Sequence, residues 1–198
     1  MKNGVIIQSL SSPAFTLKRI KGKYLGVSSY HTDPLLMIPD SECQKLHNEV
    51  TWKSLSNGNW IMLQFTPNLD VLYRYLIKCK ELNIGIRLLY IESDYPDEVC
   101  DYDFEDKKFL GYEYCEIPFD SQVITDFDWY EPLHKYYDLL NEYGLFNTVE
   151  DAEKFKAAYD DAFQKGYIGD GDMDTYIFKL YEVDAEKFMQ DYRDKVCH

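Results

Sequence analysis

Residues 66–91 read TPNLDVLYRYLIKCKELNIGIRLLYI. Thr66 is a candidate N-cap, and Pro67 stands at the first helical position, where its missing N–H costs nothing. Apolar side chains then recur at helical spacing between Leu69 and Leu76, which predicts a helix with one buried face.

Strands are expected on both sides of this helix. Asn83 and Gly85 end it, and the apolar run of residues 84–91 is typical of a strand buried on both faces. Residues 60–65, WIMLQF, predict a strand before it. Because strand, helix and strand follow one another, we expect a crossover and a parallel strand pair.

The rest of the chain also alternates strand and helix signals. Further strands are expected at residues 5–7, 14–20, 24–27, 109–117, 119–127 and 175–183, and further helices at 40–50, 131–143, 148–165 and 184–192. No internal repeat or Gly/Ser linker is visible. The sequence therefore predicts an α+β fold, a single compact domain over residues 1–198 with helices packed on a mixed β-sheet.

Sequence signatures of metal, cofactor and export are weak. The five cysteines are widely spaced and form no C-x-x-C pair, so we expect no disulfide framework and no zinc site. Residues 170–174, DGDMD, begin like a calcium loop, but Thr175 replaces the required Gly and Tyr181 the required Glu. We expect a solvated turn there, no metal and no cofactor. The apolar run at the N-terminus is too short for a signal peptide, and no later stretch approaches a membrane span, which predicts a cytoplasmic protein.

No catalytic residue is predicted. The chain has no G-x-S-x-G elbow, phosphate loop or dinucleotide fingerprint. His134 and Asp138 stand four apart on an expected helix, a spacing that could orient an imidazole, although a surface contact is the favoured interpretation. Cys100 and Cys115 lie among carboxylates, which disfavours a reactive thiolate.

Charge is distributed unevenly along the chain. The net charge of −14 divides into +5 over residues 1–87, −12 over 88–134 and −7 over 135–198. Such a chain repels nucleic acid phosphates, so we expect no direct nucleic acid binding and a cationic partner instead. A small basic cluster, Lys18, Arg19, Lys21 and Lys23, could touch phosphate, pair with the acidic middle of the chain or form a solvated turn.

The acidic middle of the chain also holds many aromatic residues. Residues 88–134 contain eleven aromatic residues among fourteen acids. Aromatic anchors surrounded by carboxylates suit the capture of a basic protein, whereas a solvated acidic loop is the plainer alternative. The predicted partner-binding residues are Asp94, Tyr95, Asp97, Glu98, Asp101, Tyr102, Asp103, Glu105 and Asp106.

Three short motifs resemble a known class of proteins. FLGYEY at 109–114, LNEYGLF at 140–146 and DAE at 151–153 are similar to segments of small bacterial immunity proteins, which neutralise toxin domains of polymorphic or contact-dependent toxin systems. The resemblance covers at most residues 109–165, and no functional residue carries over from it. It implies a cytosolic, non-enzymatic protein that occludes a basic toxin surface.

Two alternatives to a binding protein stay open from the sequence. One is an enzyme whose active-site residues are dispersed along the chain, and the other is an accessory protein of a phage or mobile element. The oligomeric state is not predicted.

Overall fold

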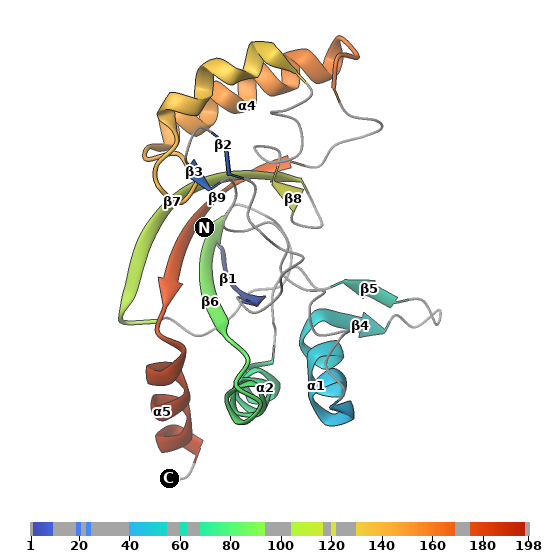
Figure 1. Cartoon of the computed structure of the whole chain (residues 1–198), viewed down its shortest axis with the longest axis vertical. Coiled ribbons are helices and arrows are strands. Elements are labelled where there is room, and N and C mark those ends of the chain that lie inside the picture. Colours follow the sequence, from blue (N-terminus) through green and yellow to red (C-terminus); the bar gives the residue numbers. More distant parts are fainter. Residues whose placement is uncertain are drawn as a thin grey trace.

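The computed structural model of this chain describes residues 2–9, 19–20, 23–24, 40–54, 60–62, 68–93, 104–116, 120–121, 130–168 and 175–196. Its centre is a five-stranded sheet of order β1-β6-β9-β7-β8 (Figure 1). The strands are β1 (Lys2–Ser9), β6 (Ile86–Ser93), β7 (Lys107–Glu116), β8 (Asp120–Ser121) and β9 (Thr175–Val183). Neighbouring strands of this sheet are antiparallel throughout.

Two short hairpins accompany the sheet. β2 (Arg19–Ile20) pairs with β3 (Lys23–Tyr24), and β4 (Trp52–Ser54) pairs with β5 (Trp60–Met62). The α+β class is confirmed, but the expected parallel pair is wrong, because β5 joins β4 in a local antiparallel hairpin and not the main sheet. A local hairpin closes a shorter loop than a crossover does, so its entropic cost is smaller.

The helices are α1 (Ser41–Thr51), α2 (Leu69–Glu81), the 3-10 helix η2 (Glu131–Leu139), α4 (Val149–Gln164) and α5 (Ala185–Val196). The N-cap of α2 differs from the expected Thr66, which lies outside the described residues with Pro67. The side chain of Asn68 accepts hydrogen bonds from the backbone N–H groups of Asp70, at 3.0 Å, and Val71, at 3.2 Å. Asn68 is extended, the backbone conformation an N-cap requires.

The segment expected as an α-helix after Glu131 forms η2 instead. Residues three apart align in a 3-10 helix, whereas residues four apart align in an α-helix. The ring of His134 accordingly lies 5.3 Å from that of Tyr137. The four-residue spacing of His134 and Asp138 aligns two side chains in an α-helix but not in a 3-10 helix. Leu133 and Tyr137 are the buried residues of η2.

Two hydrophobic clusters cover opposite ends of one sheet face. The lower cluster, at the bottom of Figure 1, joins Leu88, Tyr90, Tyr181 and Val183 of the sheet to Leu72, Tyr75 and Leu76 of α2 and Phe188 of α5. The upper cluster joins Tyr114 and Ile177 to Leu133 and Tyr137 of η2 and to Phe155 and Tyr159 of α4. A third cluster, on the opposite face, contains Leu89, Ile91, Phe178 and Leu180 with Leu145.

Residues 140–147, here called the strap, lie against β7. Phe146 exchanges backbone hydrogen bonds with Tyr112, at 2.8 and 2.9 Å. The register of β7 against β9 shifts between Phe109 and Gly111, and Gly111 has a φ of 148°. A Cβ at Gly111 would lie 2.6 Å from the Cβ of Leu145, so only glycine admits the strap this closely.

Candidate functional site

The structure describes two of the nine predicted partner-binding residues. Glu105 and Asp106 are exposed and precede β7 directly. The other seven lie outside the described residues, namely Asp94, Tyr95, Asp97, Glu98, Asp101, Tyr102 and Asp103. The calcium-like residues 170–174 also lie outside them, as do Lys18, Lys21 and Cys100.

Strand pairing brings Glu105 and Asp106 to the start of α5. Lys107, the first residue of β7, pairs with Val183, the last residue of β9. The next residue, Asp184, caps α5 by accepting hydrogen bonds from the backbone N–H groups of Glu186, at 2.9 Å, and Lys187, at 3.1 Å. The end of the acidic segment therefore lies beside the start of α5, which carries three acidic and three basic side chains.

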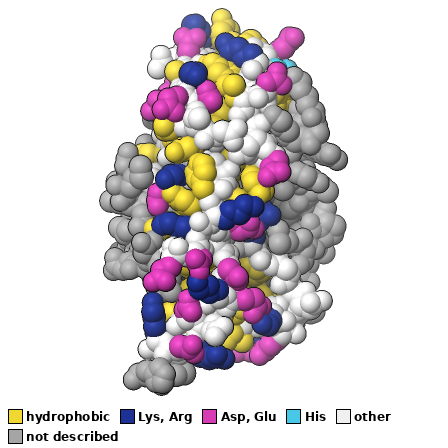
Figure 2. Space-filling view, turned by 90° about the vertical axis from the view of Figure 1, so that its left-hand side faces the viewer, with side chains coloured by type: hydrophobic (Ala, Val, Ile, Leu, Met, Phe, Trp, Pro, Cys, Tyr) yellow, Lys and Arg dark blue, Asp and Glu magenta, His cyan; other side chains and the backbone are white. Residues whose placement is uncertain are grey.

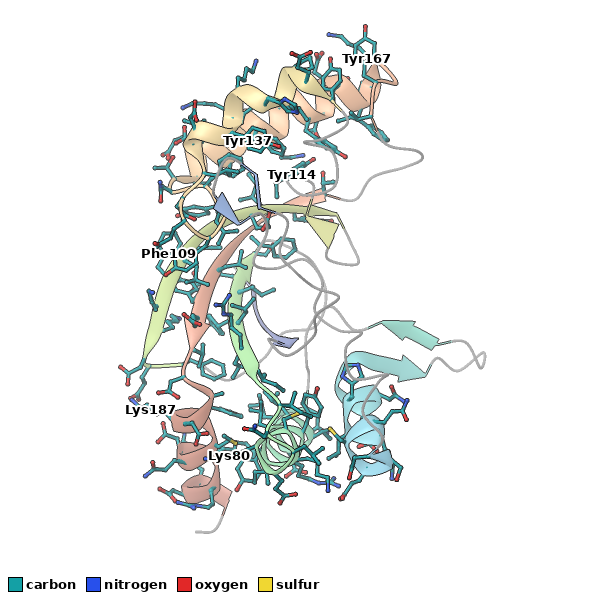
Figure 3. All side chains as sticks on the ribbon, in the orientation of Figure 1. Lys80, Phe109, Tyr114, Tyr137, Tyr167 and Lys187 are labelled. Atoms are coloured by element: carbon teal, nitrogen blue, oxygen red, sulfur yellow. The ribbon has the colours of Figure 1, made fainter. Side chains whose placement is uncertain are left out.

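A pocket of about 390 Å³ lies between the end of the acidic segment, residues 104–106, and helix α5. Its lining contains five acids and two lysines, namely Glu105, Asp106, Asp184, Asp191, Asp194, Lys187 and Lys195. Figure 3 labels Lys187 at the N-terminal end of α5, beside the lower ends of β7 and β9. We call this hollow the acidic pocket.

The apolar lining of the acidic pocket belongs to the lower cluster. Phe104, Val183 and Phe188 line it and are 5%, 6% and 2% exposed. The rings of Phe104 and Phe188 pack with centroids 5.5 Å apart. Because these side chains are fixed by packing, the pocket combines a rigid apolar wall with a carboxylate rim.

The carboxylates of the acidic pocket differ in their partners. Asp106 forms an ion pair with Lys187, Asp194 lies 3.5 Å from the Nε of Arg193, and Asp184 is engaged as the cap of α5. For Glu105 and Asp191, the described part of the chain supplies no hydrogen-bonding or cationic partner. These two carboxylates can accept hydrogen bonds and a positive charge from outside.

A polar network under α4 is the arrangement that most resembles catalytic machinery. The Tyr114 hydroxyl lies 2.7 Å from both Asp160 Oδ1 and Thr175 Oγ1, and Lys156 donates to Asp160 Oδ2 at 2.8 Å. Tyr114 is fully buried in the upper cluster. The network therefore satisfies a buried phenol and ties α4 to β7 and β9.

The buried cysteines Cys43 and Cys79 are free thiols. Burial in the lower cluster raises the pKa of Cys79 to about 12 and also raises that of Cys43. Both groups are therefore protonated at neutral pH, which makes them poor nucleophiles. Within the described ranges, no three His, Cys, Asp or Glu side chains gather as a metal site would require, and no helix is both long and apolar enough to cross a membrane.

The α5 half of the acidic pocket was not predicted from the sequence. Its lining residues Lys187, Asp191, Asp194 and Lys195 recur at spacings of three, four and seven, which places them on one helical face. That periodicity can be read in the sequence. The contact with Glu105 and Asp106 cannot, because it depends on the pairing of Lys107 with Val183.

Comparison of the chain with known proteins finds no match among family models, curated proteins or solved structures.

Proposed function

We propose that this protein is a non-enzymatic, cytosolic binding protein that captures a basic protein partner at the acidic pocket and the acidic segment leading into it. The observation that carries the proposal is the pair of carboxylates Glu105 and Asp191, which have no partner among the described residues and stand beside an apolar wall.

The chemistry of the pocket suits a lysine or arginine side chain. Both side chains have an apolar stem and a charged end, so the stem can pack on Phe104 and Phe188 while the end reaches the carboxylates. Arginine fits better, because its planar guanidinium can bind carboxylate oxygens through two parallel N–H groups. Within the pocket, the ion pair of Lys187 with Asp106 already shows a cationic side chain bound to one of these carboxylates.

Long-range electrostatics favour the same partner. The chain carries a net charge of −14, and eight acids with no base occupy residues 92–106. Such a field accelerates the approach of a basic protein and repels an acidic one. The resemblance to immunity proteins implies a toxin domain as this partner, and that identity is part of the proposal.

The test uses an arginine-rich hexapeptide as a probe, with binding followed by calorimetry and by amide NMR shifts. We expect the shifts to concentrate at residues 104–106 and on α5. The double variant Glu105→Gln/Asp191→Asn should weaken binding about tenfold, which corresponds to about 1.4 kcal/mol.

The matched control is Glu150→Gln/Glu153→Gln on α4, which changes the net charge equally at exposed positions outside the pocket. Binding by this control should match the unmodified protein. Equal losses of affinity in the two double variants, or NMR shifts spread over the whole surface, would show that net charge alone attracts the peptide. Either result would contradict specific binding at the acidic pocket.

A further inference from the structure

Two free cysteines lie where α1 packs on α2, and both belong to the lower cluster. One turn away, the rings of His47 in α1 and Tyr75 in α2 lie with their centroids 5.8 Å apart. Cys43 stands four residues before His47, and Cys79 stands four residues after Tyr75. Because residues four apart share one face of an α-helix, Cys43 and Cys79 face each other if the two helices run in opposite directions.

An ion pair beyond the cysteines shows that the helices are antiparallel. Lys78, near the end of α2, lies 3.1 Å from the carboxylate of Glu42, near the start of α1. The Cys79 thiol accordingly reaches Cys43 and donates a hydrogen bond to its sulfur. Cys79 and Cys43 are 1% and 0% exposed, so the helix pair encloses two thiols in direct contact.

The two thiols differ in how readily they lose a proton. Burial raises the pKa of both, and that of Cys79 reaches about 12. For Cys43, the effect of burial on the pKa is opposed first by the hydrogen bond from Cys79, while the charges of Asp40 and Lys78 act in opposite directions. Cys43 is also the third residue of α1, and a helix N-terminus favours an anion. Cys43 is therefore the thiol of this pair that forms a thiolate first, although burial keeps the thiolate fraction small.

We propose that Cys43 and Cys79 form a redox-sensitive latch, in which hydrogen peroxide oxidises the two thiols to a disulfide that ties α1 to α2. The Cys43 thiolate attacks one peroxide oxygen, which breaks the O–O bond, forms a sulfenic acid and releases the other oxygen as water after protonation. The Cys79 sulfur then attacks the Cys43 sulfur, and the sulfenic oxygen leaves as a second water. In total the two thiols lose two protons and two electrons, and one peroxide is reduced to two waters.

The latch acts on α1 and on the hairpin that follows it. β4 begins at Trp52, directly after α1 ends at Thr51. A disulfide between residues 43 and 79 encloses this hairpin in a closed loop, which lowers the conformational freedom of the unfolded chain. Oxidation should therefore stabilise the fold and keep α1 from separating from α2. Because burial makes both thiols slow to react, the latch closes under sustained oxidation and not under a brief exposure.

The latch is separate from the acidic pocket. α2 lies between α1 and α5 at the lower end of the molecule (Figure 1), and Lys80 of α2 pairs with Glu186 on the α5 side. On that side, Figure 2 shows lysine or arginine side chains next to acidic ones over the lower end of the molecule. The two thiols lie on the α1 side of α2, in an apolar interior. This inference therefore does not rest on the proposed capture of a basic partner.

The test exposes the folded protein to hydrogen peroxide and maps its disulfides by mass spectrometry of unreduced proteolytic fragments. We expect one link, Cys43 to Cys79. The melting temperature should rise by about 5 °C or more, and dithiothreitol should reverse the rise. The same treatment of urea-unfolded protein should give a mixture of links among the five cysteines, because the fold no longer selects one pair.

Single variants separate the roles of the two thiols. In Cys79→Ala, peroxide should leave Cys43 as a sulfenic acid that dimedone labels, with no rise in melting temperature. In Cys43→Ala, labelling of Cys79 should be at least tenfold slower. The matched control is Cys115→Ala in β7, which should keep both the link and the rise in melting temperature.

The inference is overturned if peroxide leaves Cys43 and Cys79 as thiols, if another pair of cysteines links in the folded protein, or if the link forms without raising the melting temperature. Labelling of Cys79 in Cys43→Ala as fast as that of Cys43 in Cys79→Ala would overturn the proposed order of attack. The fragment map of the unmodified chain decides the main point even if an alanine variant fails to fold.

Discussion

The upper and lower ends of the sheet hold their helices by different means. At the upper end, partly buried hydrogen bonds add to the apolar packing of the upper cluster: Asn141 donates to the carbonyl of Leu110 at 2.7 Å, and the Tyr114 hydroxyl lies 2.7 Å from both Asp160 and Thr175. At the lower end, α2 and α5 meet the sheet through apolar packing, and the ion pairs that α5 makes with α2 and with the start of β7 lie at the surface. Lys80 with Glu186 and Lys187 with Asp106 are both exposed pairs.

This difference explains where a binding site can form. A buried polar group that holds the fold is already satisfied and cannot serve a ligand without destabilising the protein. Exposed ion pairs contribute little to stability, so they can be exchanged for contacts with a partner. The lower end thus combines a rigid apolar wall with carboxylates that the fold does not need.

The largest effect should come from Gly111→Ala at the upper end. The added Cβ would meet Leu145 Cβ at 2.6 Å and the Phe146 carbonyl oxygen at 2.8 Å, in a backbone conformation that L-residues rarely adopt. We expect a loss of about 3 kcal/mol or more in the free energy of unfolding, measured by urea denaturation. Gly166→Ala is the control, because its φ is also positive but nothing lies within 4 Å. It should lose about 1 kcal/mol, and equal losses would show that the strap is not held closely.

A smaller effect is expected when one polar side chain is removed from each end. Asn141→Ala deprives the Leu110 carbonyl of its donor, and the N–H groups of Tyr143 and Leu145 of their acceptor. We expect a loss of about 2 kcal/mol, since these groups are partly buried. Lys80→Ala, which removes the exposed pair with Glu186, should change the stability by at most about 0.5 kcal/mol. A larger loss for Lys80→Ala than for Asn141→Ala would reverse the comparison.

The smallest expected effect is the loss of stability at acid pH that comes from two carboxyl groups at helix starts, Asp40 before α1 and Asp151 in α4. The backbone N–H of Cys43 lowers the pKa of Asp40 at the lower end, and the Lys154 ammonium lowers the pKa of Asp151 at the upper end. A carboxyl whose pKa is lower in the folded state stabilises the fold above its unfolded value of about 3.9. That contribution is lost as the pH falls through the folded value.

Carboxyl NMR titration should therefore find both pKa values below the ordinary range. High salt should separate them, because it screens the exposed Lys154 pair more than a direct backbone hydrogen bond. In 1 M NaCl we expect the pKa of Asp151 to return toward the ordinary value and that of Asp40 to stay low. Equal responses to salt would indicate that the pKa of Asp40 is lowered mainly by the charge of Lys78, 3.5 Å away, and not by the backbone hydrogen bond.

Local signals made part of this fold predictable. The strand at 175–183 coincides with β9, and the helix expected at 148–165 is α4, where the Thr148 side chain accepts a hydrogen bond from the Asp151 N–H at 3.2 Å. The strand buried on both faces is β6, which lies between β1 and β9. Each of these features depends on residues close together in the chain, so the sequence pattern carries the needed information.

Long-range features were beyond the same reasoning. The sequence pattern around residues 60–65 fits a parallel crossover as well as a hairpin, and the choice depends on Trp52–Ser54, where no strand was expected. The charge density of the acidic segment drew attention to Glu105 and Asp106, which line the acidic pocket, but not to the helix that they face. Asp191 becomes part of the pocket only because β9 places α5 beside the start of β7.

The position of β9 between β6 and β7 also governs how the chain can fold during synthesis. β6 ends at Ser93 and β7 at Glu116, but the strand that joins them runs from Thr175 to Val183. At roughly 5–20 residues per second, a ribosome needs about 5–20 s to proceed from the end of β6 to the end of β9. Throughout this interval Leu89 and Ile91 lack their neighbour in the sheet. The nascent chain must therefore remain soluble with an open hydrophobic strand, a state in which molecular chaperones bind.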